Sequence, residues 1–108
     1  MVKIIDVDYI LDESGFVEMK YFLSISNNII IIEFVLILFL IKDDEKIEIL
    51  KYDYSQKENF HVHKNYLKSN KKEYFANEIN ISEILLIKRE IELNWREYIR
   101  LYNQKEYI

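Results

Sequence analysis

The run Ile29-Ile30-Ile31-Ile32-Glu33-Phe34-Val35-Leu36-Ile37-Leu38-Phe39-Leu40-Ile41 is the longest apolar segment of the chain. It is rich in β-branched and aromatic side chains, which favour extended structure. A membrane-spanning helix needs about 20 apolar residues, whereas this run is shorter and contains Glu33. We therefore expect residues 29–41 to form a buried β-strand, and we expect no membrane span.

Both faces of this expected strand are apolar. Strand side chains alternate between faces, so the even-numbered residues from Ile30 to Leu40 share one side and the odd-numbered ones share the other. One helix can cover only one side. Six uncovered side chains would forgo roughly 1.5–3 kcal/mol each, on the order of 10 kcal/mol together, which approaches the whole stability of a domain, about 5–15 kcal/mol. We therefore predict that strong curvature of the sheet, a second copy of the chain or a different protein covers the second side.

The remaining strands follow from the turns between them. The chain has no proline and a single glycine, Gly15, so its turns must consist of Asp, Asn, Ser and Lys. Polar turn segments of this kind occupy residues 12–15, 26–28, 42–45 and 55–59. The segments between them, residues 2–10, 16–25, 29–41, 46–54 and 60–64, are rich in β-branched and aromatic residues. Because short turns can join only antiparallel neighbours, these segments predict a β-meander.

The C-terminal part of the chain changes to a helical period. From Ile81 onward, apolar side chains recur every three or four positions; they are Ile84, Ile87, Ile91, Trp95, Tyr98 and Tyr102. The N-terminal cap is either Asn80, with Glu83 three residues later, or Ser82. The sequence thus predicts one α+β domain over residues 1–108. It is a curved antiparallel meander of five to six strands (about residues 2–76) with one long C-terminal helix (about 81–104) packed on one face.

Composition excludes several classes of function. Phosphate-binding loops, dinucleotide-binding fingerprints and nucleophile elbows each need two or more glycines at fixed spacing, and this chain has one. The absence of cysteine excludes disulfides, thiol nucleophiles and cysteine-based zinc sites. The segment 6–13 is acidic, unlike a secretory signal, so we expect a cytoplasmic protein.

Charge is distributed unevenly along the chain. Residues 1–50 contain four lysines and ten acidic residues, giving −6, whereas residues 51–108 contain 11 basic and nine acidic residues, giving +2. Residues 61–72 contain no acid, and the basic residues there are His61, His63, Lys64, Lys68, Lys71 and Lys72. This strip is either an anion-binding surface or a solvated lysine-rich loop. For nucleic acid, the candidate binding residues are Lys68, Lys71, Lys72, Tyr54 and Tyr66, because tyrosines can stack on unpaired bases.

His61 and His63 are the two histidines of the chain. In an extended segment they point to one face, about 6–7 Å apart, while Phe60 and Val62 point to the other. Such a pair can act as acid and base, as metal ligands, or as an anion clamp with Lys64. Histidines on a strand face are also often purely structural.

Cleavage of RNA without a metal needs a base, an acid and a cation. Histidine has an unperturbed pKa of about 6.5 and can be either acid or base at neutral pH. The cation would come from Lys64, Lys68, Lys71 or Lys72. The pattern does not favour a divalent metal, because two histidines form an incomplete site that Asp53, Glu58 or another carboxylate would have to complete. We therefore expect no cofactor.

The second half of the chain, from about Lys46, resembles the TumE-type toxins of prokaryotic toxin–antitoxin systems. The residues that carry the resemblance are Tyr52-Asp53, His61-Val62-His63-Lys64, Tyr74, Ser82, Glu83, Leu85 and Trp95. Family members often have Asn and glycines where this chain has Tyr54, Ser55 and Gln56. The resemblance implies that Asp53, His61, His63 and Lys64 form the site. It also implies a nucleic-acid target and a cognate antitoxin that often contains a helix-turn-helix.

Two functions therefore remain open. In the first, the chain is a toxin acting as a ribonuclease: His61 and His63 exchange protons, Lys64 stabilises the phosphate charge and Asp53 orients an imidazole. In the second, the chain is a non-catalytic interaction module that dimerises or binds a partner through its apolar sheet face. Both functions predict a homo- or hetero-oligomer.

Overall fold

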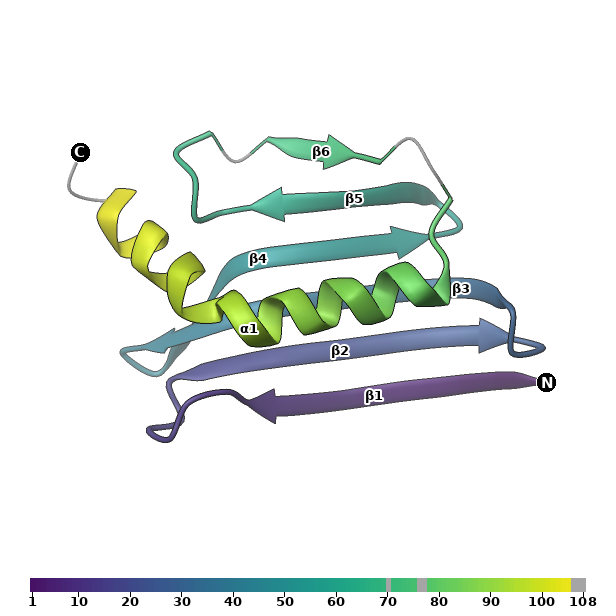
Figure 1. Cartoon of the computed structure of the whole chain (residues 1–108), viewed down its shortest axis with the longest axis horizontal. Helices are drawn as coiled ribbons and strands as arrows, with labels where there is room; N and C mark the ends of the chain where they lie inside the picture. Colours follow the sequence, from purple (N-terminus) through teal and green to yellow (C-terminus); the bar gives the residue numbers. More distant parts are fainter. Residues whose placement is uncertain (70, 76–77, 106–108) are drawn as a thin grey trace.

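The computed structural model describes residues 1–69, 71–75 and 78–105, and these form an antiparallel sheet with one long helix (Figure 1). In sheet order, which is also chain order, the elements are β1 (Val2–Ile10), β2 (Val17–Ser26), β3 (Ile30–Lys42), β4 (Glu45–Ser55), β5 (Glu58–Lys64) and β6 (Lys72–Tyr74), followed by the helix α1 (Ile81–Lys105). The predicted α+β class, meander and C-terminal helix are confirmed. The predicted end of the sheet at residue 76 lies outside the described residues.

Two hairpin turns rely on residues that tolerate the left-handed backbone region. Asn27 and Asn28 join β2 to β3 with φ of 53° and 62°, and Asp43 and Asp44 join β3 to β4 with φ of 54° and 62°. Two consecutive positive φ angles are typical of type I′ turns, whose twist matches that of the strands on either side. Short Asn and Asp side chains adopt this conformation more easily than other non-glycine residues. The meander therefore forms these turns without glycine.

The helix α1 covers one face of the sheet and completes the core. Ile84 and Ile91 point from it toward the sheet and are 0% and 1% exposed, as are Phe34 (0%) of β3 and Leu50 (1%) of β4. The helix begins at a reciprocal cap: the Glu83 backbone N–H donates to Asn80 Oδ1 at 2.9 Å, and Asn80 Nδ2 donates to Glu83 Oε1 at 3.2 Å. No helix among the described residues has the length and hydropathy that crossing a membrane would require.

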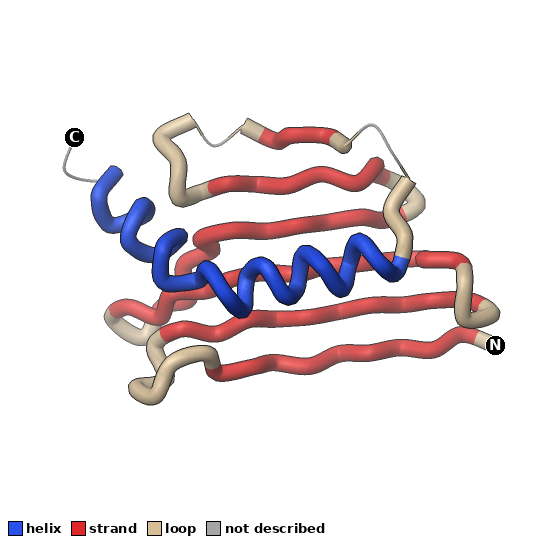
Figure 2. The backbone as a smooth tube through the Cα atoms, in the orientation of Figure 1, coloured by secondary structure: helices blue, strands red, loops and turns tan. Residues whose placement is uncertain are grey.

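The opposite face of the sheet, here called the open face, has no helix on it among the described residues (Figure 2). Its centre is apolar: Ile37 is shielded by its neighbours, whereas Phe22, Val35 and Phe39 are half-buried. The described sheet does not close on itself, because β1 and β6 are its two edges. A second copy or a partner protein covering this face remains a prediction.

Candidate functional site

Strand β5 lies between β4 and β6 and presents both histidines on the open face. Its alternate residues Phe60 and Val62 are 3% and 1% exposed and belong to the core under α1. Antiparallel pairing places His61 between Asp53 of β4 and Tyr74 of β6. His63 lies one row along, and its neighbours are Lys51 of β4 and Lys72 of β6. These two cross-strand rows form the candidate site.

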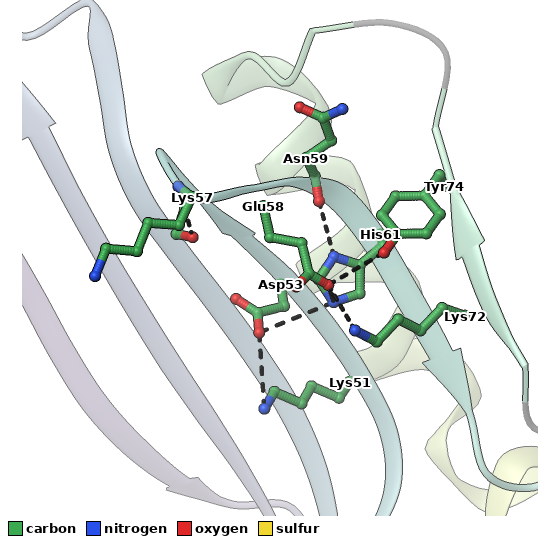
Figure 3. A network of polar contacts seen from close by, with 9 residues as sticks. Lys51, Asp53, Lys57, Glu58, Asn59, His61, Lys72 and Tyr74 are labelled. Atoms are coloured by element: carbon green, nitrogen blue, oxygen red, sulfur yellow. Dashed lines mark hydrogen bonds and ion pairs between the residues drawn. The ribbon is translucent and has the colours of Figure 1, made fainter.

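His61 is the buried centre of the site, at 2% exposure. Its Nδ1 lies 2.8 Å from the backbone carbonyl oxygen of Asn59, and its Nε2 lies 3.3 Å from Glu58 Oε1 and 4.0 Å from Asp53 Oδ2 (Figure 3). A carbonyl oxygen can only accept, so Nδ1 must carry a proton to bond to it. Nε2 also faces acceptors, so only the doubly protonated imidazolium can donate from both ring nitrogens.

Glu58 connects His61 to the protein surface. Its carboxylate, 39% exposed, accepts hydrogen bonds at Oε1 from Lys72 Nζ at 2.7 Å and from the Tyr74 hydroxyl at 3.3 Å. The Lys72 hydrogen bond is the main reason that the pKa of Glu58 is lowered, and the charges of His61 and Lys72 add to the effect. The same bond raises the pKa of Lys72. Glu58 is therefore a carboxylate, and Lys72 a cation, at neutral pH.

Carboxylates lie beside His61, whereas positively charged side chains lie beside His63. Its ring centroid lies 5.0 Å from that of His61, with the planes at 77°. Partial burial is the first cause lowering the pKa of His63 below 6.5, and the positive charges of His61, Lys72 and Lys51 lower it further. At neutral pH the His63 imidazole is thus neutral, and one of its ring nitrogens can accept a proton.

The structure brings Asp53 to the pair but separates Lys64 from it. Asp53 lies directly across from His61, and its Oδ2 is 3.7 Å from Lys51 Nζ. Lys64 follows His63 in β5 and therefore points to the helix side, where its Nζ lies 3.0 Å from Glu73 Oε2. That partner is the main reason that the pKa of Lys64 is raised. On the histidine face the nearby lysines are Lys51 and Lys72.

The candidate nucleic-acid residues also separate into groups. Lys72 belongs to the histidine cluster, and Lys68 and Lys71 are exposed in the segment between β5 and β6. Tyr66 packs on Tyr98 of α1, with ring centroids 4.9 Å apart, and burial is the first cause raising its pKa. Tyr54 is half-buried against the core. The two tyrosines thus lie away from the histidine face.

Two residues of the site, Glu58 and Lys51, are absent from the set that sequence suggested for catalysis or nucleic-acid binding. Side chains three apart in a strand point to opposite faces, so the spacing of Glu58 and His61 gives no signal for their contact, which lies next to the register shift of the β4–β5 pairing. Lys51 becomes a neighbour of His63 only through the register of β4 and β5. Within the described ranges, no group of three or more His, Asp or Glu side chains is arranged to hold a metal ion.

No protein-family model, curated protein or solved structure matches the chain significantly. The function is therefore inferred from the geometry of the site.

Proposed function

We propose that this chain is the toxin of a prokaryotic toxin–antitoxin system, acting in the cytoplasm as a metal-independent ribonuclease. The observation that supports the proposal best is the pair of adjacent histidines in opposite environments. His61 faces three acceptor groups, and the neutral His63 lies between Lys51 and Lys72. Cleavage of a phosphodiester needs one proton donor, one proton acceptor and a positive charge, and these residues supply all three.

His63 is the residue that takes the proton of the attacking 2′-hydroxyl. The O2′–P bond forms as the P–O5′ bond breaks, which leaves a 2′,3′-cyclic phosphate on one product. The leaving 5′-oxygen needs a proton, and the buried His61 supplies it through the Glu58 carboxylate, which bridges Nε2 to the surface. Lys51 and Lys72 stabilise the charge that develops on the phosphate oxygens. Lys64 has no part in these steps, because it points away.

A second function is supported by the apolar centre of the open face. Phe22, Val35 and Phe39 lie on the same side of the sheet as His61 and His63, and they are half-buried without any described element over them. A surface of this kind is typical of a protein–protein interface. The two functions are compatible in a toxin, since an antitoxin that bound this surface would also cover His63.

The test is an RNA cleavage assay in the presence of a chelator, paired with a growth assay. We expect the wild type to release products with cyclic phosphate ends and to arrest growth. His63→Ala should lower the cleavage rate by about 10²-fold or more, because that is the usual contribution of a general base. Lys64→Ala is the matched control: it removes the next residue, which faces the other side, and should keep both activities.

Equal growth arrest by the wild type and the His63→Ala variant, or cleavage that the chelator abolishes, would contradict the proposal. A chain that binds a protein partner with nanomolar affinity but cleaves no RNA and causes no arrest would favour the interaction module instead.

A further inference from the structure

Strand β1 forms one edge of the sheet, and no described element pairs with its outer side (Figure 1). It is 9 residues long and pairs with β2 over its whole length without a register shift. The opposite edge, β6, is only 3 residues long. Natural sheets usually protect a long edge with proline, a β-bulge or a covering element. Within the described part of the chain, β1 has none of these three.

The even-numbered residues of β1 carry the free backbone groups of this edge. At the two ends of the strand, the Met1 carbonyl oxygen accepts a hydrogen bond from the Asn27 N–H at 3.1 Å, and the Leu11 N–H donates to the Val17 carbonyl oxygen at 2.8 Å. Hydrogen-bonded and non-hydrogen-bonded pairs alternate along an antiparallel ladder, so each odd-numbered residue of β1 directs its N–H and C=O toward β2. The residues that direct theirs outward are Val2, Ile4, Asp6, Asp8 and Ile10. Each offers one donor and one acceptor to a further strand.

The same residues point their side chains toward the open face. The odd-numbered Ile5 and Tyr9 pack against the core under α1, and alternation puts the even-numbered side chains on the other side. Among these, Val2, Ile4 and Ile10 are 55%, 63% and 67% exposed. An added strand would cover part of this apolar surface while it pairs with the backbone.

Asp6 and Asp8 set the charge that a partner strand must carry. Both are exposed, and neither forms a hydrogen bond or an ion pair within the described ranges. Asp6 faces Phe22 and Asp8 faces Lys20 on β2, which leaves one cation beside two carboxylates. Opposite charges on directly facing residues of paired strands attract, and like charges repel. A strand with a lysine or arginine opposite each aspartate is therefore the favoured partner.

A second copy of the chain is a poor partner for this edge. Two β1 strands related by a two-fold axis normal to the sheet would pair antiparallel, with even-numbered residues facing even-numbered ones. In the registers that pair most of the strand, Asp6 lies directly opposite or diagonal to an aspartate of the other copy, and these like charges repel. The two carboxylates thus protect β1 against pairing with itself.

We propose that the outer edge of β1 binds an extended, basic segment of a partner protein as an additional strand. The segment runs antiparallel to β1, because antiparallel pairing is the more stable form. Its alternate positions, in its own N-to-C direction, face β1 from Ile10 back to Val2 and are apolar, basic, basic, apolar and apolar. Main-chain hydrogen bonds supply the affinity, and the alternate side chains supply the choice of partner. The proposal concerns the edge of the sheet and does not depend on the ribonuclease function.

The probe that tests this is a fluorescently labelled peptide, VTKVKVIEV, titrated with the intact chain in a polarisation assay. Its two lysines face Asp8 and Asp6 when its first residue faces Ile10. A second peptide has glutamate in place of both lysines. We expect the lysine peptide to bind about tenfold or more tightly than the glutamate peptide, because two facing pairs change from attraction to repulsion.

Charge reversal tests the same pairing from the side of the protein. Asp6→Lys combined with Asp8→Lys should invert the preference, so that the glutamate peptide binds more tightly. The matched control is Glu33→Lys combined with Glu45→Lys, which changes the net charge equally at exposed glutamates of β3 and β4. This control should keep the preference of the wild type.

A proline tests the contribution of the backbone. Ile4→Pro removes an outward N–H and no hydrogen bond to β2, a position at which edge strands tolerate proline. Binding of the lysine peptide should fall about tenfold or more, because a main-chain hydrogen bond is lost and the ring obstructs the added strand. Ile4→Thr keeps the N–H and should bind the peptide nearly as well as the wild type. Circular dichroism confirms that each variant folds, and the charge reversal keeps the test valid if Ile4→Pro is unstable.

Several outcomes would overturn the proposal. These are equal binding of the two peptides, no binding of either at millimolar concentration, and unchanged binding of the lysine peptide by Ile4→Pro. A wild-type dimer that Ile4→Pro converts to a monomer would show that a second copy occupies the edge instead. RNA takes no part in these measurements, so the strand-binding edge and the ribonuclease can each fail alone.

Discussion

His61 is a polar side chain at 2% exposure whose hydrogen-bonding groups all lie within the protein. Asn59, Glu58 and Asp53 surround its two ring nitrogens. A buried polar ring is tolerated only when its partners are in place, because each unsatisfied group costs free energy. The residue therefore holds the β4–β5 turn and the start of β5 in one arrangement.

Replacing His61 should accordingly cost stability as well as activity. In His61→Leu, the carbonyl of Asn59 and the carboxylate of Glu58 lose a donor, so we expect the free energy of unfolding to fall by about 1–3 kcal/mol. Urea denaturation followed by circular dichroism measures this. His63→Leu is the control, since His63 is more exposed and its loss should change stability less. Equal losses for the two variants would contradict the buried role of His61.

The pH dependence of stability should carry a signature of His63. Its pKa is lowered in the folded chain, so the unfolded chain binds a proton more readily. The stability that comes from a neutral His63 is therefore complete above pH 6.5 and is lost as the pH falls through the lower, folded-state value. Unfolding midpoints measured from pH 8 to pH 5 should fall, and His63→Asn should flatten this part of the curve. If the unfolding midpoint of His63→Asn falls with pH as steeply as that of the wild type, His63 is not the cause of the fall.

Catalysis should follow the same titration. If His63 is the base, its lowered pKa keeps it neutral and active below pH 6.5, so the acidic limb of the rate profile should have a midpoint under that value. Neutralising the nearby cation in Lys72→Met should move the midpoint upward, because the positive charge of Lys72 is one cause of the lowering. An acidic midpoint above 6.5 in the wild type would contradict this assignment.

Among the elements, α1 depends on its cap and on two apolar side chains. Ile84→Ala should lower the free energy of unfolding by about 2–5 kcal/mol, because Ile84 is 0% exposed and the truncation leaves a cavity. Asn80→Ala should lower it by about 1 kcal/mol through loss of the cap. Leu86→Ala is the control on the same helix: Leu86 is 69% exposed, and its truncation should change stability by no more than about 0.5 kcal/mol. Chemical denaturation of the three variants should follow this order.

Local patterns predicted most elements of the fold, and they failed where strand pairing decides the outcome. The continuous run of β-branched and aromatic residues over 29–41 predicted β3, the polar turn segments predicted the limits of the other strands, and the three- and four-residue spacing after Ile81 predicted α1. Alternation also placed His61 and His63 together, and by the same rule it puts Lys64 on the opposite side. Residues Lys51 and Lys72 could not be assigned to His63 from sequence, because their proximity depends on the register of three strands.

On the scale of the whole molecule, a helix covers one side of the sheet, and no described element covers the other. The open face combines the apolar side chains Phe22, Val35 and Phe39 with the histidine pair. Apolar side chains that the described elements leave only half-buried favour association. The side that α1 leaves free is thus available both for a partner and for a substrate.

We expect the purified chain to associate through this face when no partner is present. Sedimentation equilibrium should give a mass above the 13.3 kDa of one chain, and Phe39→Lys should return the molecule to a monomer, since it places a charge in the apolar centre. Leu93→Lys changes an exposed leucine of α1, on the other side of the molecule, and should leave association unchanged. A monomeric wild type at high concentration would contradict the expectation.

The strictly sequential order of the strands has a consequence for synthesis on the ribosome. Each strand pairs with the one made just before it, so hairpins can assemble as the chain emerges, and such local pairing favours fast folding. The helix that closes the core occupies residues 81–105 and is made after the six described strands. Until it emerges, the apolar side chains that it covers are exposed together with those of the open face. A nascent chain of this protein therefore needs protection at that moment, which gives a binding partner produced nearby an early opportunity to engage it.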